Sequence, residues 1–261
     1  MANARALRLL WAAARAQAQL TRNSIEDLRP LFGGPLVSLV SVAILVHSDR
    51  ADLAAYGLVA AVLMTIGQMG LFVASEIVFM ERNEQTLELA VATPAPYSLV
   101  LLGRVLVLTL LGLVGALESW LLVRLVFGLS LTVHHPLLLV ATLVAASLAS
   151  AGTAMLTAAL FSLGRQVRTF QNAINGPLYL LGGVLVPVTF LPSWLQPLSP
   201  LVFFYWAANL LRASFNPEPP PDPVRGVAMI LLLGTLAALA GAWLLRRMLD
   251  HLRREGTLGL T

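Results

Sequence analysis

Two residue types on which many functional sites depend are missing from this sequence. There is no cysteine, which excludes disulfides, iron–sulfur clusters and thiolate-ligated zinc. There is also no lysine, because all 17 basic residues are arginine. A phosphate-binding loop and a protein-kinase site both need a lysine at the nucleotide phosphates, so neither is present. If nucleotide energy drives this chain, a second chain must bind the nucleotide.

Charged residues are also scarce. They make up 11% of the 261 residues, whereas 58% are hydrophobic, and the mean hydropathy is +0.81. About a quarter of the residues in a soluble domain are charged. The apolar residues here gather in blocks of about 20, the length that crosses ~30 Å of hydrocarbon. A porin-type barrel would show short alternating segments instead. The sequence therefore predicts an all-α, polytopic membrane protein.

We expect six membrane spans between residues 31 and 247. They cover approximately residues 31–47, 53–74, 98–127, 137–163, 171–189 and 227–245. Gly33, Gly34 and Pro35 predict an irregular start to the first span, and Gly176-Pro177 and Gly182-Gly183 predict interruptions of the fifth.

Before the last span, residues 190–216 are apolar, aromatic and rich in proline. This composition predicts a re-entrant helical element, because the prolines prevent one straight helix. Residues 248–261 form a short basic tail.

The N-terminal segment, residues 1–30, is predicted to be an amphipathic helix on the membrane surface. Arginine recurs every seven residues, which keeps the four side chains in one stripe: Arg8, Arg15, Arg22 and Arg29. Apolar residues fall on the opposite face: Leu10, Ala14, Ala18, Ile25 and Leu28. This pattern suits an interfacial helix against anionic headgroups, although a solvated cytosolic helix would share it.

The distribution of arginine predicts the orientation. With six spans, twelve arginines lie on the side of both termini, and the other side holds Arg50, Arg212 and Arg225. The positive-inside rule then places both termini in the cytoplasm.

A polar segment, residues 80–97, separates the second and third predicted spans on the cytoplasmic side. Four of the eight residues from Glu81 to Glu88 are charged. Helical spacing relates Glu81, Glu84, Leu87 and Glu88, and Thr93-Pro94 would end the helix. We expect an exposed amphipathic helix that a cytosolic partner contacts; a solvated loop is the alternative.

Glu81 to Pro94, ERNEQTLELAVATP, resembles the segment E-R-x-x-G-T-L-E-x-L-x-x-T-P of type-2 ABC exporter permeases. The departures are Gln85 in place of glycine and Ala90 in place of leucine. The resemblance extends to the N-terminal helix, the six spans and the proline-rich aromatic stretch. It implies a permease of the drug- and antibiotic-resistance type, with this segment as the coupling helix. The coupling residues would be Glu81, Arg82, Glu84, Leu87, Glu88, Thr93 and Pro94.

The same resemblance implies the partners and the location. Two ATPase subunits would bind ATP and Mg, and a second permease subunit, self or homologue, would complete the pathway. An extracellular gate would include Phe190, Phe203, Phe204 and Tyr205. The chain would lie in a bacterial plasma membrane, bind no nucleic acid, and hold no cofactor of its own.

Few other residues suggest chemistry. Three polar residues lie inside the third predicted span, namely Arg104, Glu118 and Arg124, and intramembrane charges are often functional. His134 and His135 are adjacent but have no evident third ligand, so we expect no metal site. No catalytic constellation is recognisable, so we do not expect an enzyme.

The expected pathway is apolar, which favours a hydrophobic drug, antibiotic or lipid as cargo. A lipid-linked glycoconjugate or polysaccharide is the alternative cargo. A function of a different class, an ion-coupled carrier or membrane-embedded enzyme that acts without an ATPase, is disfavoured by the scarcity of acidic residues at the span centres.

Overall fold

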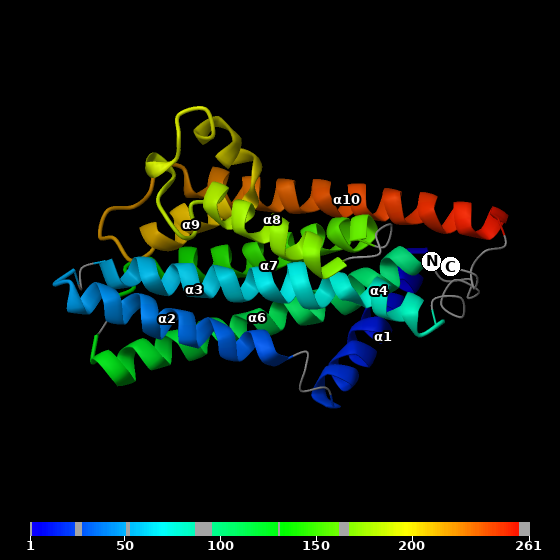
Figure 1. Cartoon of the computed structure of the whole chain (residues 1–261), viewed down its shortest axis with the longest axis horizontal. Coiled ribbons are helices and arrows are strands. Elements are labelled where there is room, and N and C mark those ends of the chain that lie inside the picture. Colours follow the sequence, from blue (N-terminus) through cyan, green and yellow to red (C-terminus); the bar gives the residue numbers. More distant parts are fainter. Residues whose placement is uncertain are drawn as a thin grey trace.

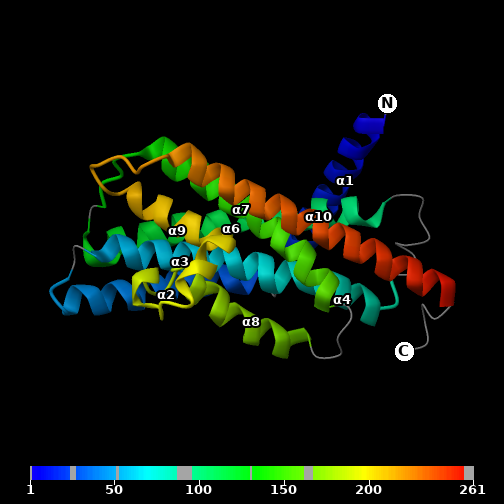
Figure 2. The same ribbon diagram turned by 90° about the horizontal axis from the view of Figure 1, so that it is seen from above.

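The computed structural model describes residues 2–23, 28–50, 53–86, 96–129, 131–161 and 167–255. Throughout this part of the chain the regular elements are helices, which confirms the all-α fold class. Most long helices run along one axis, and α1 (Ala2–Asn23) projects across it (Figures 1 and 2).

Among the described residues, four helices are long and apolar enough to cross a membrane. One is a continuous helix, Ala54–Asn83, composed of α3 (Ala54–Gln68), the π-helical η3 (Met69–Ala74) and α4 (Ser75–Asn83). The others are α6 (Tyr97–Phe127), α7 (Pro136–Phe161) and α10 (Pro223–Glu255). A shorter apolar helix, Leu31–His47, lies within α2 (Arg29–His47), and α8 (Val167–Leu181) is a further short helix. The chain is therefore a multi-pass membrane protein.

One predicted span end was wrong, and two predicted helix irregularities, at Pro35 and at Gly176-Pro177, are not observed. The second span does not end near Ala74 but continues through Asn83, because charges near a span end can reach water or a counter-ion without breaking the helix. The first span is helical from Arg29, with Pro35 inside it. Likewise α8 continues through Pro177 and ends at Leu181. Neighbouring helices can compensate for the hydrogen bond that a proline removes from a membrane helix.

The N-terminal helix is shorter than predicted. Because α1 ends at Asn23, Arg29 belongs to α2 and does not extend the stripe of exposed arginines, Arg8, Arg15 and Arg22. The face of α1 that packs on the bundle contains Ala13, Gln17 and Thr21, whereas Ala18 is exposed. The predicted position Ile25 lies outside the described residues. Leu7 and Trp11 are 71% and 66% exposed, which leaves an apolar stripe beside the arginines.

The helix Ala54–Asn83 lies at the centre of the bundle. In its most apolar stretch 78% of the residues are buried, compared with 17% for α10. Small residues allow the close approach: a Cβ at Gly112 of α6 would lie 3.0 Å from Ile66 Cα, and one at Gly67 would lie 2.8 Å from the Phe204 ring. Small residues at helix contacts are typical of membrane bundles.

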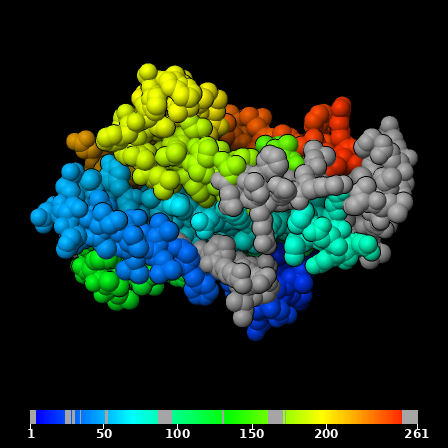
Figure 3. Space-filling view, viewed as in Figure 1, coloured from blue at the N-terminus to red at the C-terminus, as the bar shows by residue number. Residues whose placement is uncertain are grey.

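The segment between α8 and α10 forms a raised lobe at the end of the bundle away from α4 (Figure 3). It contains the 3₁₀ turns η4 (Val188–Phe190) and η5 (Gln196–Leu201) and the helix α9 (Phe203–Ala213). Arg212 of α9 fixes the lobe by donating to the carbonyl oxygens of Gly183 (2.6 Å) and Val184 (3.1 Å). Its guanidinium also stacks over Tyr56 of α3, 5.0 Å from the ring centroid.

The contact between α7 and α10 gives the first prediction. A Cβ at Gly234 of α10 would overlap the backbone of Ala149 in α7, whereas one at Gly176 of α8 would meet nothing within 4 Å. Alanine raises helix propensity at both sites by up to ~1 kcal/mol. We expect Gly234→Ala to lower the Tm in detergent because overpacking typically costs ~1–3 kcal/mol. Gly176→Ala should leave the Tm unchanged or raise it. Shifts of the same sign and size in the two variants would contradict this packing account.

Candidate functional site

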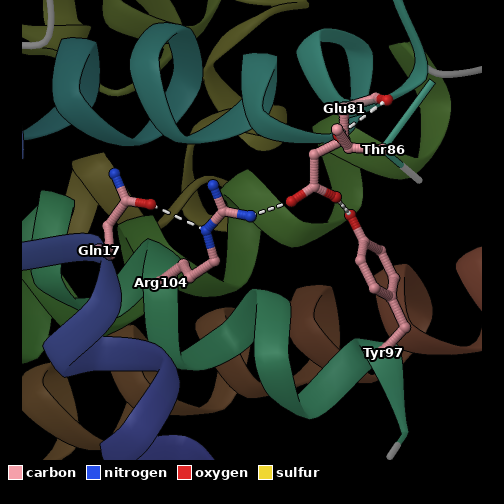
Figure 4. Close-up of polar contacts among 5 residues, drawn as sticks. All are labelled: Gln17, Glu81, Thr86, Tyr97 and Arg104. Atoms are coloured by element: carbon pink, nitrogen blue, oxygen red, sulfur yellow. Dashed lines mark hydrogen bonds and ion pairs between the residues drawn. The ribbon is translucent and has the colours of Figure 1, made fainter. Parts of the chain in front are cut away.

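A carboxylate and a guanidinium from different helices form an ion pair at one end of the bundle. Glu81 lies in the last turn of α4, and its Oε1 pairs with Nη1 of Arg104 in α6 (Figure 4). The hydroxyl of Tyr97, the first residue of α6, donates to the other carboxylate oxygen, Oε2. The side chains of Arg104 and Glu81 are 18% and 15% exposed. The pair is therefore largely shielded from water.

The N-terminal helix joins the same cluster. Arg104 Nε donates to Oε1 of Gln17 at 2.8 Å, and Gln17 Nε2 donates to Oγ1 of Thr21 at 3.1 Å. Helices α1 and α6 approach closely at Gly103 of α6, where a Cβ would lie 2.6 Å from the carbonyl oxygen of Leu10 in α1. The four residues Gln17, Glu81, Tyr97 and Arg104, called here the polar network, connect three segments distant in sequence.

The polar network is strong because its charges are paired and hydrogen-bonded. Removing one partner of a shielded ion pair leaves an uncompensated charge, which costs ~3–5 kcal/mol. Arg104 donates from both Nε and Nη1, and Glu81 accepts with both carboxylate oxygens. The geometry suits a mechanical brace between helices.

The backbone turns sharply after the end of α4, three to four residues beyond Glu81. Asn83 is the last residue of α4, and the N–H groups of Glu84 and Thr86 donate to the carbonyl oxygens of Met80 and Glu81, both at 2.9 Å. Gln85 has a left-handed backbone with φ of 57°. This is a common way to end a helix. The predicted helical face from Glu81 to Glu88 was therefore wrong at its start, because the helix stops between its first two members.

Three of the seven predicted coupling residues lie in the described part of the chain. Glu81 belongs to the polar network, Arg82 is half-buried, and Glu84 is exposed. The others lie outside the described residues: Leu87, Glu88, Thr93 and Pro94.

Sequence reasoning did not single out Gln17 and Tyr97. Gln17 lies one turn from both Ala13 and Thr21 on the buried face of α1, away from the arginine stripe. Tyr97 directly follows Pro96, at the start of α6. The sequence signal for Gln17 was a polar residue on the face of α1 opposite the arginines. The signal for Tyr97 was a tyrosine at a span end near an acidic residue.

The other two intramembrane polar residues lie far from the polar network. Arg124 is twenty residues beyond Arg104 on α6, which corresponds to ~30 Å along the helix. It is exposed, and its guanidinium lies 5.5 Å from the ring centroid of Trp120. Glu118 is half-buried on the same helix.

The four aromatic residues predicted as a gate do not gather in one place. Phe203 and Phe204 are 4% and 1% exposed and pack into the bundle, with the Phe204 ring 5.2 Å from that of Tyr179. Phe190 is 78% exposed on the lobe. Tyr205 is half-buried and packs edge-to-face on Trp206.

Side chains of neighbouring helices donate to backbone carbonyls of the central helix. The three bonds are Tyr179 Oη to Met64 O (3.3 Å), Ser150 Oγ to Ile66 O (3.1 Å) and Gln171 Nε2 to Phe72 O (3.4 Å). Phe72 lies in η3 and the other two acceptors lie in α3, and π-helical turns are frequent at functional sites. Helix α8 supplies two of the donors from one buried stripe, Gln171, Asn175 and Tyr179. The centre of the span is therefore braced from α7 and α8.

Comparison with known protein families identifies the chain. Residues 8–216 match the family model described as ABC-2 type transporter, from α1 to the end of the lobe. The chain belongs to the ABC-2 type transporter family. Members of this family are the membrane permeases of ABC transporters, which are transport components rather than catalysts and normally work with an ATPase subunit. A comparison with curated protein sequences gives no match.

Family membership gives the turn at Gln85 a meaning. The ABC-2 permease motif has glycine at this position, and in this chain Gln85 adopts the left-handed backbone that glycine favours. The left-handed backbone costs an L-residue other than glycine roughly 1–2 kcal/mol, and Gln85 adopts it at a single position.

The polar network gives the second prediction. In this permease, Arg104→Met leaves the Glu81 carboxylate shielded without its cation, and we expect the free energy of unfolding in detergent to fall by ~3 kcal/mol or more. The double variant Glu81→Gln/Arg104→Met should lose much less than the sum of the two single losses, because partners in contact are not additive.

The control for this cycle is Arg225→Met, which removes an exposed arginine at the start of α10 and should have little effect. Additive losses in the double variant would show that Glu81 and Arg104 do not interact.

Proposed function

We propose that this ABC-2 permease is the transmembrane subunit of an ABC exporter, driven by a separate ATPase that contacts residues 80–97. The observation that carries the proposal is the polar network. It ties the end of α4, from which the predicted coupling segment departs, to both α1 and α6. A load applied near Glu84 would therefore reach three helices at once.

The central helix supplies a route from that end into the membrane. Ala54–Asn83 is one continuous helix of 30 residues, ~45 Å long, and it carries Glu81 in its last turn. Motion of its cytoplasmic end would act on the π-helical segment and the end of α3, where side chains of α7 and α8 are bonded to the backbone. Rigid elements linked by such contacts are a physical means of coupling distant sites.

ATP would bind to the partner ATPase and not to this chain. Because the chain contains no lysine, it lacks the phosphate-contacting residue of a P-loop, so ATP and Mg would bind to the ATPase. Two ATPase subunits and two permease subunits would form the transporter, the second permease being a copy or a homologue.

The proposed topology has six spans, in which α2 and α8 would cross the membrane beside the four long apolar helices. Helix α8 alone spans only ~22 Å, so the lobe with η4, η5 and α9 would fill the remaining depth as a re-entrant element. Both termini would be cytoplasmic in a bacterial plasma membrane, with α1 at the interface through Trp11 and its arginines. The lobe would close the extracellular end of the pathway, and Phe203 and Phe204 would anchor it by packing into the bundle.

We favour a hydrophobic drug, antibiotic or lipid as the cargo, consistent with a resistance-type exporter. The mostly apolar lateral surfaces of α2 and α8 support this choice, since both would line the pathway. Exposed on these two helices are Phe32, Leu36, Val40, Ile44, Ile174 and Leu180.

The third prediction concerns the contact with the ATPase. Glu84 is exposed at the end of α4, and Glu218 is exposed in the proline-rich segment at the opposite end of the bundle. We expect Glu84→Arg to weaken co-purification of the co-expressed ATPase by at least ~10-fold, or ~1.4 kcal/mol. The matched variant Glu218→Arg should have no effect. Retention of the ATPase and of cargo-stimulated ATP hydrolysis by Glu84→Arg would overturn the assignment of this contact.

A further inference from the structure

An apolar cavity of about 280 Å³ lies between α3, α6, α7 and α9, in the half of the bundle away from the polar network. Its walls include Leu58 and Val62 of α3, Leu113 of α6 and Leu143 of α7. Among the described residues that line it, Trp120 of α6 alone has a polar side-chain atom, its indole nitrogen.

Water is a poor occupant for this space. The volume corresponds to about nine water molecules at ~30 Å³ each, but a buried water needs two to four polar partners, and apolar cavities remain dry. A void without atoms loses the dispersion contacts of its walls. Leu117 lines the cavity and is also 58% exposed on the lateral surface of α6. The opening therefore faces the hydrocarbon of the membrane.

A cationic group lies next to this opening. Arg124 is one helical turn beyond Trp120, and its guanidinium is 5.5 Å from the Trp120 ring centroid. Within the described part of the chain, no carboxylate pairs with Arg124, and its side chain is exposed. At a span end, such a residue lies at the depth of lipid headgroups. Guanidinium binds phosphate oxygens well because its donors form a planar fork.

We propose that this cavity is a phospholipid site. One acyl chain, from the leaflet on the side of the α6–α7 connection, enters past Leu117 and fills the space between α6 and α7. The lipid phosphate pairs with Arg124 beside the Trp120 ring. The described lining includes residues of α3, α6, α7 and α9 but none of α2 or α8, the helices whose exposed apolar side chains we assign to the export pathway.

The test is native mass spectrometry of the full-length chain, delipidated in detergent and titrated with dioleoyl phosphatidylglycerol. Dioleoylglycerol, which has the same chains without phosphate, is the second probe. We expect one saturable phosphatidylglycerol per chain, bound at least 10-fold more tightly than dioleoylglycerol. Arg124→Gln should reduce phosphatidylglycerol affinity to that of dioleoylglycerol, and Arg225→Gln should not.

Two pairs of variants test the cavity itself. Leu143→Trp fills it from α7, whereas Val144→Trp places the same bulk on the neighbouring residue, which is 39% exposed and does not line the cavity. Leu117→Trp blocks the opening at a surface position that tolerates bulk, and Leu121→Trp, one turn further on α6, is its control. We expect at least 10-fold weaker binding for Leu143→Trp and Leu117→Trp only.

Unchanged binding in folded Leu117→Trp protein, or equal losses in the variants and their controls, would overturn the cavity site. Equal affinity for the two probes would overturn the role of Arg124.

Discussion

A guanidinium group that is shielded from water is stabilised by a paired anion, and Arg104 has such a partner in a cluster that joins three segments of the chain. Its charge is balanced by Glu81 of α4, its Nε is bonded to Gln17 of α1, and Tyr97 holds the other face of the carboxylate. The pairing allows α4 to remain helical to Asn83 despite its charges. It also fixes where α1 crosses α6. The end of the bundle at which we propose that the ATPase binds is thus organised by one ion pair.

The packing of the membrane helices depends on the central helix, Ala54–Asn83, which the other helices surround. Glycines stand at its contacts, for example Gly67 on the central helix and Gly112 on α6. Because glycine has no side chain, the neighbouring residues can come close to the backbone there. The central helix also presents carbonyls of α3 and of the π-helical segment to donors from α7 and α8, of which Gln171 reaches both Phe72 O and Ser75 Oγ. Close packing and these polar bonds give the helix defined neighbours at both its centre and its charged end.

Much of this architecture could be read from the sequence, and the failures have a common cause. Long apolar blocks predicted α6 and α7 nearly to their ends, because span length is set by membrane thickness. Predictions from local sequence failed where contacts with other helices decide the structure. Pro35 and Pro177 lie inside helices, and Glu81 lies in a span helix because Arg104 pairs with it. Gln17 became part of the site only through a contact 87 residues away in sequence, which no spacing rule contains.

The central claim is that the ion pair of Glu81 and Arg104 transmits work between the ATPase and the membrane helices. The most direct test measures cargo-stimulated ATP hydrolysis in the purified permease–ATPase complex for Glu81→Arg, Arg104→Glu and the swapped double variant. We predict that each single variant still binds the ATPase but loses at least ~10-fold of the stimulation, and that the swap restores part of it. Full stimulation in either folded single variant would contradict the claim.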